Sequence, residues 1–173
     1  MSINYVMAVD PGRATGVAIG RYSVNMPVEV IYTGIIPGGT TGFAEWLHQT
    51  NDGKYVAETD CSYNFPENYG DLDWHLDVVS ETFKHRANKF VPDTEPLRIE
   101  GVLIDHFGST MVWQTPADKT LVGDDFLKTN DLWVTGKDVD HTDGRDANDA
   151  MIHLFVYMMR QRHLPTLEAY WRA

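Results

Sequence analysis

Three segments at the start of the chain carry the apolar patterns of β-strands. Residues 5–10 form an apolar run that ends in an acid, and residues 15–23 and 28–36 alternate apolar and polar positions. The turn sequence DPGRATG follows the first segment, and PGGTTG ends the third. Because alternation with a period of two is typical of strands and the connections are short, the pattern predicts a meander of three antiparallel strands.

Helical and strand-like patterns alternate over the remainder of the chain. Phe43, Trp46 and Leu47 have the i, i+3, i+4 spacing of a helix with one buried face over residues 41–49. We then expect a strand at 54–60, a loop at 61–75, helices at about 76–90 and 97–107, a strand at 111–116 and a long helix at 141–162. This order predicts an α/β domain.

Length and composition favour one globular domain, because 173 residues with 43% hydrophobic side chains are enough to bury a core. No apolar run approaches the length of a membrane span, and the first residues lack the features of a signal peptide. The single cysteine, Cys61, cannot form an internal disulfide, which favours a reducing compartment. We therefore expect a cytoplasmic protein without membrane contact.

The net charge of −11 is unusual for a protein that binds DNA, because phosphate contacts normally come from Lys and Arg. The basic residues are unevenly placed, and the first 80 residues contain only Arg13, Arg21 and Lys54. Any DNA-facing surface should therefore come from the second half of the chain. The candidates there are Lys84, Arg86, Lys89, Lys119 and Arg145.

Asp10 is the first candidate for chemistry, because it ends a strand and begins a glycine-containing turn. A carboxylate at that place projects from the edge of the sheet, and the glycines let backbone and ligand approach closely. An Asp-Pro-Gly sequence is also common in turns without any function. Sugar kinases and actin-like ATPases place an Asp and glycines after a first strand too, so this motif alone does not choose between activities.

Asp146 and Asp149 are three residues apart in the last predicted helix, so their carboxylates share one face. Like charges at this spacing repel unless a cation offsets them. His153 lies one turn further along the same face, and Asp143 is expected to cap the helix. The alternative is a solvated first turn, where acids are favoured by the helix dipole.

Glu58 is the third candidate, near the end of the strand expected at 54–60. Strand ends can meet at one edge of a sheet, which would bring Glu58 near Asp10. An ordinary exposed strand residue is the alternative. Glu100 competes for the same role, but its surroundings predict a helix and place it on the polar side, so Glu58 is preferred.

Four carboxylates at the ends of rigid elements suit phosphodiester hydrolysis with two divalent ions. Such an ion pair, about 3.5–4 Å apart, stabilises the attacking and leaving oxygens together and supplies activated water. Mg²⁺ prefers oxygen ligands and keeps several waters, so a few carboxylates are enough. The catalytic and metal-binding set predicted in this way is Asp10, Glu58, Asp146 and Asp149.

The motifs DPGxxTG at 10–16 and DAxDA at 146–150, with WQTPADK at 113–119, resemble the RuvC family of Holliday junction resolvases. The chain is most similar to the short RuvC-like proteins of bacteriophages, which implies a setting in the bacterial host cytoplasm. The resemblance implies an RNase H-like fold, with a mixed five-stranded sheet of three antiparallel and then two parallel strands, flanked by helices.

The same resemblance implies a homodimer that nicks branched DNA, such as four-way junctions, with Mg²⁺ and leaves 5′-phosphate and 3′-hydroxyl ends. Two ions per site are implied, and Mn²⁺ should substitute for Mg²⁺. The acidic tetrad of the family corresponds to the four carboxylates named above. Lys119 matches a family lysine that would contact phosphate near the scissile bond.

Two features depart from the family pattern. The region at about 60–95 is longer and contains an aromatic loop, in which Tyr63, Phe65 or Tyr69 would stack on unpaired bases or simply pack the loop. The acidic balance is the second departure, and it bears more on junction selectivity than on catalysis.

Other functions stay open at this point, because the RNase H-like fold serves many activities. A nuclease with the same chemistry would act on flaps, forks or RNA–DNA hybrids. An ATP-binding actin-like or kinase-like module would need a second phosphate-binding motif and a duplicated domain, for which 173 residues leave no room. A non-catalytic binding module is the third alternative, and four acids at suitable element ends argue against it.

Overall fold

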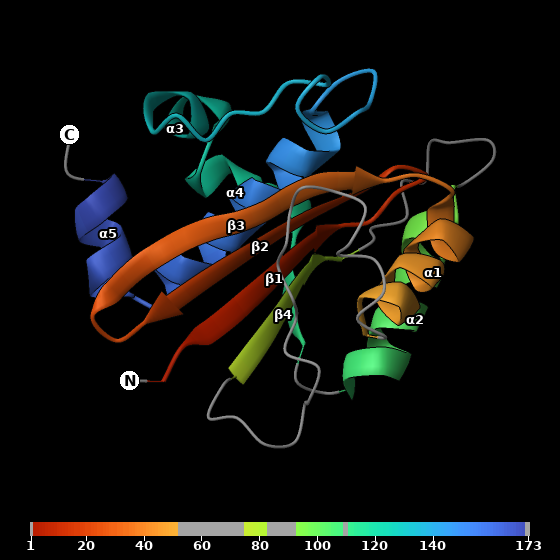
Figure 1. Cartoon of the computed structure of the whole chain (residues 1–173), viewed down its shortest axis with the longest axis horizontal. Coiled ribbons are helices and arrows are strands. Elements are labelled where there is room, and N and C mark those ends of the chain that lie inside the picture. Colours follow the sequence, from red (N-terminus) through yellow and green to blue (C-terminus); the bar gives the residue numbers. More distant parts are fainter. Residues whose placement is uncertain (1, 52–74, 83–92, 109–110, 172–173) are drawn as a thin grey trace.

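A five-stranded mixed sheet forms the centre of the computed structural model, which describes residues 2–51, 75–82, 93–108 and 111–171. The strands lie in the order β3-β2-β1-β4-β5, and Figure 1 shows the first four of them side by side. β1, β2 and β3 pair antiparallel, whereas β4 pairs parallel to β1 and β5 parallel to β4. The strands are β1 Asn4–Asp10, β2 Thr15–Ser23, β3 Met26–Ile36, β4 His75–Glu81 and β5 Val112–Gln114.

This sheet confirms the predicted arrangement of three antiparallel and then two parallel strands. The meander follows the short connections that the sequence predicts, with Asp10 paired to Gly16 at the turn end of the first hairpin. Flanking helices were expected, and the structure has them. They are α1 Gly39–Asn51, α2 Glu95–Phe107, α3 Asp124–Thr129, α4 Arg145–Arg160 and α5 Leu164–Tyr170, with a 3₁₀ helix η3 at Pro116–Leu121.

The helix expected over residues 76–90 is wrong for residues 76–81, because these residues form β4. Val78, Val79 and Ser80 are buried in succession. A parallel strand in the middle of a sheet is covered on both faces, so its buried residues are consecutive rather than alternating. Such a run cannot be distinguished from part of a buried helix by periodicity. The strand expected at 54–60 and most of the enlarged region at 60–95 lie outside the described residues.

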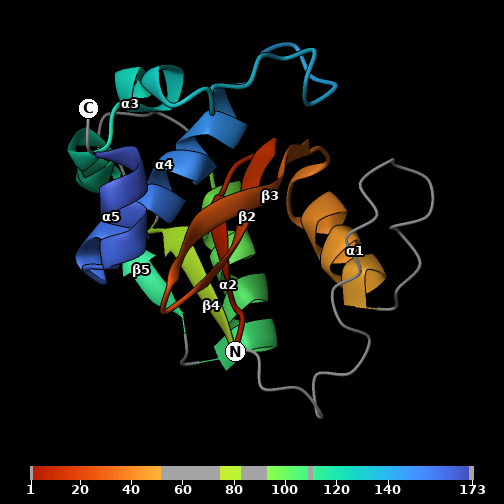
Figure 2. The ribbon, with the colours of Figure 1, turned by 60° about the vertical axis from the view of Figure 1, so that its left-hand side comes forward.

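Helices lie on both sides of the sheet (Figure 2). Two apolar clusters hold them against it. In β1, Val6 and Ala8 belong to the cluster that contains α4, whereas Met7 and Val9 belong to the cluster that contains residues of α1 and α2. This division follows from the alternation of side chains along a strand. No helix in the described part of the chain is long and apolar enough to cross a membrane.

The long C-terminal helix predicted at 141–162 is α4, which is buried at every residue from 147 to 158. Its N-cap is Gly144 rather than the expected Asp143. Asp143 instead accepts a hydrogen bond from the Arg145 N–H at 2.9 Å, so it satisfies one free donor of the first turn. The burial of α4 fixes the position of the acids in its first two turns.

Candidate metal centre

Asp10 and Glu81 are neighbours because β1 and β4 run parallel and end at the same edge of the sheet. The paired register runs up to Val9 opposite Ser80, so the next residues on the two strands are Asp10 and Glu81. The carboxyl ends of parallel strands are where α/β proteins place their ligands. Glu81 therefore occupies, beside Asp10, the place that the sequence analysis assigned to Glu58.

Gly16 lets the first turn of α4 approach this edge. A Cβ atom at Gly16 would overlap the backbone carbonyl of Asp146 and lie 3.0 Å from the Ala147 nitrogen. Because Gly16 pairs with Asp10, the close contact brings the first turns of α4 beside the end of β1. The packing of α4 thus explains Gly16, the second glycine of DPGRATG.

Lys119 lies at the centre of the acidic group. Its ammonium nitrogen is 3.0 Å from Asp10 Oδ1, 2.8 Å from Glu81 Oε2 and 2.9 Å from Asp149 Oδ2. An ammonium has three donors, and these three carboxylate oxygens match them in number. The side chain is only 20% exposed, so the interactions form in a partly dehydrated pocket.

The 3₁₀ helix η3 holds Lys119 in place. A capping box joins Thr115 and Asp118 at its start, and Asp118 also forms an ion pair at 2.6 Å with Arg160 near the end of α4. These contacts fix the backbone of η3. The Lys119 side chain extends from this fixed backbone and places its ammonium in the pocket.

His153 and Gln114 lie beneath the acids. The fully buried His153 places Nε2 2.9 Å from Glu81 Oε2 and Nδ1 2.7 Å from Gln114 Oε1. Gln114, the last residue of β5, donates from Nε2 to the backbone carbonyl of His153 at 3.1 Å. The imidazole is therefore held at both nitrogens.

Burial and crowding shift the pKa values of these acids. Burial raises the pKa of Asp10 to about 7, although the Lys119 ammonium opposes the shift. Burial and the nearby Asp143 and Asp149 also raise the pKa of Asp146. For Glu81, burial acts upward, but the hydrogen bonds from His153 and Lys119 outweigh it and lower the pKa. Opposed shifts among neighbouring carboxyl groups are typical of functional sites.

Arg145 contacts the group from its outer side. Its Nε lies 3.1 Å from Asp149 Oδ1, and its Nη1 lies 3.0 Å from Asp124 Oδ2. Asp149 Oδ1 is buried and has no hydrogen-bond partner with adequate geometry among the described residues. The Arg145 guanidinium is the cation that offsets the charge of this buried oxygen.

The structure brings together part of the predicted set. Asp10, Asp149 and Lys119 are in direct contact, and Asp146 lies one helical turn before Asp149, half-buried, with electrostatic interactions to Asp149 and Lys119. Sequence reasoning missed Glu81, although an apolar run ending in an acid is the same signal that identified Asp10. The predicted residues outside the described ranges are Glu58, Phe65, Lys84, Arg86 and Lys89.

The donor set fits a divalent cation. Asp10, Glu81 and His153 offer ligand atoms that all lie within 4.8 Å of one another. Carboxylate oxygens are the ligands that hard cations prefer. The Lys119 ammonium shows that the carboxylates already converge on one positive charge.

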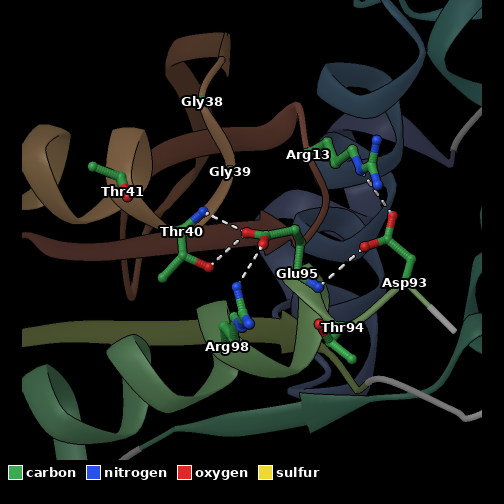
Figure 3. Close-up of a pocket in the computed structure, with 9 residues that line it drawn as sticks. All are labelled: Arg13, Gly38, Gly39, Thr40, Thr41, Asp93, Thr94, Glu95 and Arg98. Carbon is green, nitrogen blue, oxygen red and sulfur yellow. Dashed lines mark hydrogen bonds and ion pairs between the residues drawn. The ribbon is translucent and has the colours of Figure 1, made fainter.

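A polar cleft of about 580 Å³ lies beside this edge, between the turn after β1 and the starts of α1 and α2 (Figure 3). Glu95 crosses it and accepts hydrogen bonds from the N–H and hydroxyl of Thr40, at 2.9 and 2.8 Å. Arg13 forms an ion pair with Asp93 at 3.5 Å. Glu95 of α2 therefore already occupies the hydrogen-bond donors of Thr40 at the start of α1. These contacts hold α1 and α2 together across the cleft.

The fold of this chain is similar to that of known proteins. Two solved structures from Thermus thermophilus are similar over nearly their whole length: RuvC in complex with a Holliday junction substrate, and RuvC alone. The TM-scores are 0.51 for the complex and 0.50 for RuvC alone. The matched region covers 97% of each RuvC chain, and 93% and 92% of this chain respectively. The chain has the RuvC-type RNase H-like fold. Sequence identity to both is 10%, and neither a family model nor a curated protein sequence matches.

Proposed function

We propose that the protein is a metal-dependent endonuclease that nicks branched DNA. The observation that carries this proposal is the convergence of Asp10, Glu81 and Asp149 on one cation position. These carboxylates come from three elements, β1, β4 and α4, and they meet at the edge of the sheet where the parallel strands end. The RuvC-type fold supports the same conclusion.

Asp10, Glu81, Asp146 and Asp149 would hold the metal, with Glu81 in the place first assigned to Glu58. Two Mg²⁺ ions, or Mn²⁺ in their place, would supply activated water and stabilise charge on the phosphate oxygens. Asp10 must be deprotonated to bind a cation, and its position between two strands keeps its carboxylate facing the site. Lys119 would turn from the acids to a phosphate oxygen beside the scissile bond. Cleavage would leave 5′-phosphate and 3′-hydroxyl ends.

The proposed substrate is a four-way junction, following the Holliday junction bound by the Thermus thermophilus protein. A homodimer would present two such sites to opposite strands. Among the residues predicted to contact DNA, Arg145 lies beside the acidic group. The DNA contacts of Phe65, Lys84, Arg86 and Lys89 stay predictions. Flaps, forks and RNA–DNA hybrids with the same chemistry are the competing substrates.

A nicking assay with labelled four-way, flap, fork and linear duplex DNA and an RNA–DNA hybrid tests the proposal. With Mg²⁺ or Mn²⁺ we expect cleavage of the four-way junction, and Asp10→Asn, Glu81→Gln and Asp146→Asn should each reduce it at least about 100-fold. Asp125→Asn is the matched control, because this carboxylate is fully exposed on α3, away from the acidic group.

The outcomes separate the parts of the proposal. Full activity in EDTA would remove the metal from it. Equal cleavage of linear duplex would remove the preference for branched DNA and leave the nuclease. Full activity of Glu81→Gln would show that the fourth acid lies elsewhere, with Glu58 as the next residue to substitute.

A further inference from the structure

His153 is the buried group at the site that the proposed function does not yet use. It belongs to α4, one turn after Asp149, and its side chain is completely buried. Its Nε2 faces Glu81 Oε2 at 2.9 Å, on the side where the carboxylates meet. A buried histidine needs a partner for each ring nitrogen, and here one of the two partners is a carboxylate of the acidic group.

The hydrogen bonds of Gln114 determine which ring nitrogen carries the proton. Gln114 donates from Nε2 to the His153 carbonyl, so its Oε1 is the atom that faces the ring. An amide oxygen only accepts, and therefore Nδ1 of His153 carries a hydrogen and donates it. In the metal-free protein Nε2 donates a second hydrogen to Glu81, and loss of that proton would leave it able to bind a metal ion.

Metal-binding histidines show this same arrangement. One ring N–H is donated to a fixed acceptor, which sets the tautomer and the ring orientation, and the other nitrogen faces the ion. Here the fixed acceptor is Gln114, which β5 places below the ring. The imidazole cannot rotate without breaking this bond, so Nε2 stays aimed at the acids.

The distances suit one ion. The ligand atoms of Asp10, Glu81 and His153 lie within 4.8 Å of one another. Ligands about 2.1 Å from a shared ion lie at most about 4.2 Å apart, so a closure of a few tenths of an ångström is enough. The three residues come from β1, β4 and α4, which places the donors on different sides of such an ion.

We propose that His153 is a metal ligand through Nε2, and that the site consequently binds transition-metal ions such as Mn²⁺ and Co²⁺ in preference to Mg²⁺. Mg²⁺ prefers oxygen donors only, whereas a mixed nitrogen and oxygen site favours first-row transition ions, more strongly for Co²⁺ than for Mn²⁺. This inference rests on the proposed function in one respect, because both require a metal at the acidic group.

The test measures metal binding to the full chain without DNA. Titration calorimetry compares Mg²⁺, Mn²⁺ and Co²⁺, and pulsed EPR of the Mn²⁺-loaded protein detects ligand nitrogen, with ¹⁵N-labelled histidine identifying the residue type. We expect histidine nitrogen coupling in the wild type. His153→Gln should remove it and lower Mn²⁺ affinity about 10-fold or more, while Mg²⁺ affinity changes less than about 3-fold.

His163→Gln is the matched control, because His163 is also held at both ring nitrogens, by Thr166 and the Ser23 carbonyl, far from the acids. This variant should keep the nitrogen coupling. Gln114→Met is the second variant, and it should weaken Mn²⁺ binding about 10-fold while coupling persists. If His153→Gln does not fold, the Mn²⁺ affinity and nitrogen coupling of Gln114→Met test whether His153 binds the metal.

Bound Mn²⁺ without nitrogen coupling in the wild type would overturn the inference and leave the proposed nuclease intact, with His153 only orienting Glu81. An unchanged ratio of Mn²⁺ to Mg²⁺ affinity in folded His153→Gln would overturn it as well. Failure to bind any of the three ions would overturn both proposals. Nitrogen coupling without junction cleavage would overturn only the proposed function.

Discussion

Lys119 and a divalent ion require the same carboxylate oxygens. The ammonium contacts Asp10, Glu81 and Asp149 at once, in the place that a metal bound by these acids would need. In the metal-free protein it neutralises acids that would otherwise repel one another in a buried pocket. A metal bound by these acids would displace the ammonium, and the released side chain would become available for a phosphate.

Substitution Lys119→Met should destabilise the metal-free protein by about 3 kcal/mol, because the buried acids lose their cation. Added Mn²⁺ should restore most of this stability, and the affinity for Mn²⁺ should exceed that of the wild type because no ammonium competes. Urea unfolding with and without Mn²⁺ measures both effects. Lys128→Met, at an exposed lysine 4.0 Å from Asp125, is the control and should change little. Equal stability of the two metal-free variants would contradict this account.

The raised pKa of Asp10 predicts that metal binding releases a proton. With a pKa of about 7, the Asp10 carboxyl is mostly protonated at pH 6 and mostly ionised at pH 8 in the metal-free protein. A metal binds only the ionised form, so affinity should rise with pH up to about 7 and then level off. Calorimetry in two buffers of different ionisation enthalpy should show close to one more proton released at pH 6 than at pH 8. Equal release at both pH values would contradict the shift.

The packing of α4 on β2 determines where its acids lie, and the contact permits no side chain at Gly16. A methyl group there would overlap the Asp146 carbonyl, which is rigid backbone. The same contact joins the two motifs that the sequence analysis identified separately, because Gly16 closes the Asp10 turn and Asp146 begins the acidic pair.

Gly16→Ala should cost about 1–3 kcal/mol of stability, since extra volume in a packed contact forces the backbone to move. It should also reduce metal affinity and junction cleavage at least about 10-fold, because α4 carries Asp149 away from Asp10. Thermal unfolding and metal titration measure these effects. Gly101→Ala is the matched control: that helical glycine has open space around it, and alanine there should stabilise α2 by up to about 1 kcal/mol. Unchanged metal affinity in Gly16→Ala would show that the contact does not position the acids.

Local patterns predicted most elements and three of the four acids that lie together at this edge, and the limits of that prediction have a physical cause. Asp10 and Asp149 are found because each belongs to a short motif with a recognisable turn or helix. Glu81 depends on a parallel pairing between β1 and β4, which are more than sixty residues apart in the chain. No local pattern records that pairing, and burial on both faces removes the alternation from β4. The contact of Lys119 with the acids depends likewise on how η3 packs against α4.

The whole molecule carries a net charge of −11, so the DNA of the proposed function would approach against repulsion unless cations intervene. Divalent ions at the acidic group would reverse the local charge where the scissile phosphate must lie. We therefore expect binding of a four-way junction to depend on divalent ions as well as on salt. Ca²⁺ is the useful probe, because it binds oxygen ligands at longer distances than Mg²⁺ and should hold DNA with little cleavage.

Fluorescence anisotropy with a labelled junction should show affinity at least about 10-fold higher in Ca²⁺ than in EDTA at the same ionic strength. Affinity should also fall steeply between 50 and 200 mM salt, as released counterions require. Asp10→Asn should lose most of the Ca²⁺ effect, whereas Asp125→Asn, which removes one negative charge far from the site, should keep it. If both variants behaved alike, total charge rather than a bound ion would govern the encounter with DNA. A loss confined to Asp10→Asn would locate the effect at the acidic group, because the two substitutions change the net charge equally.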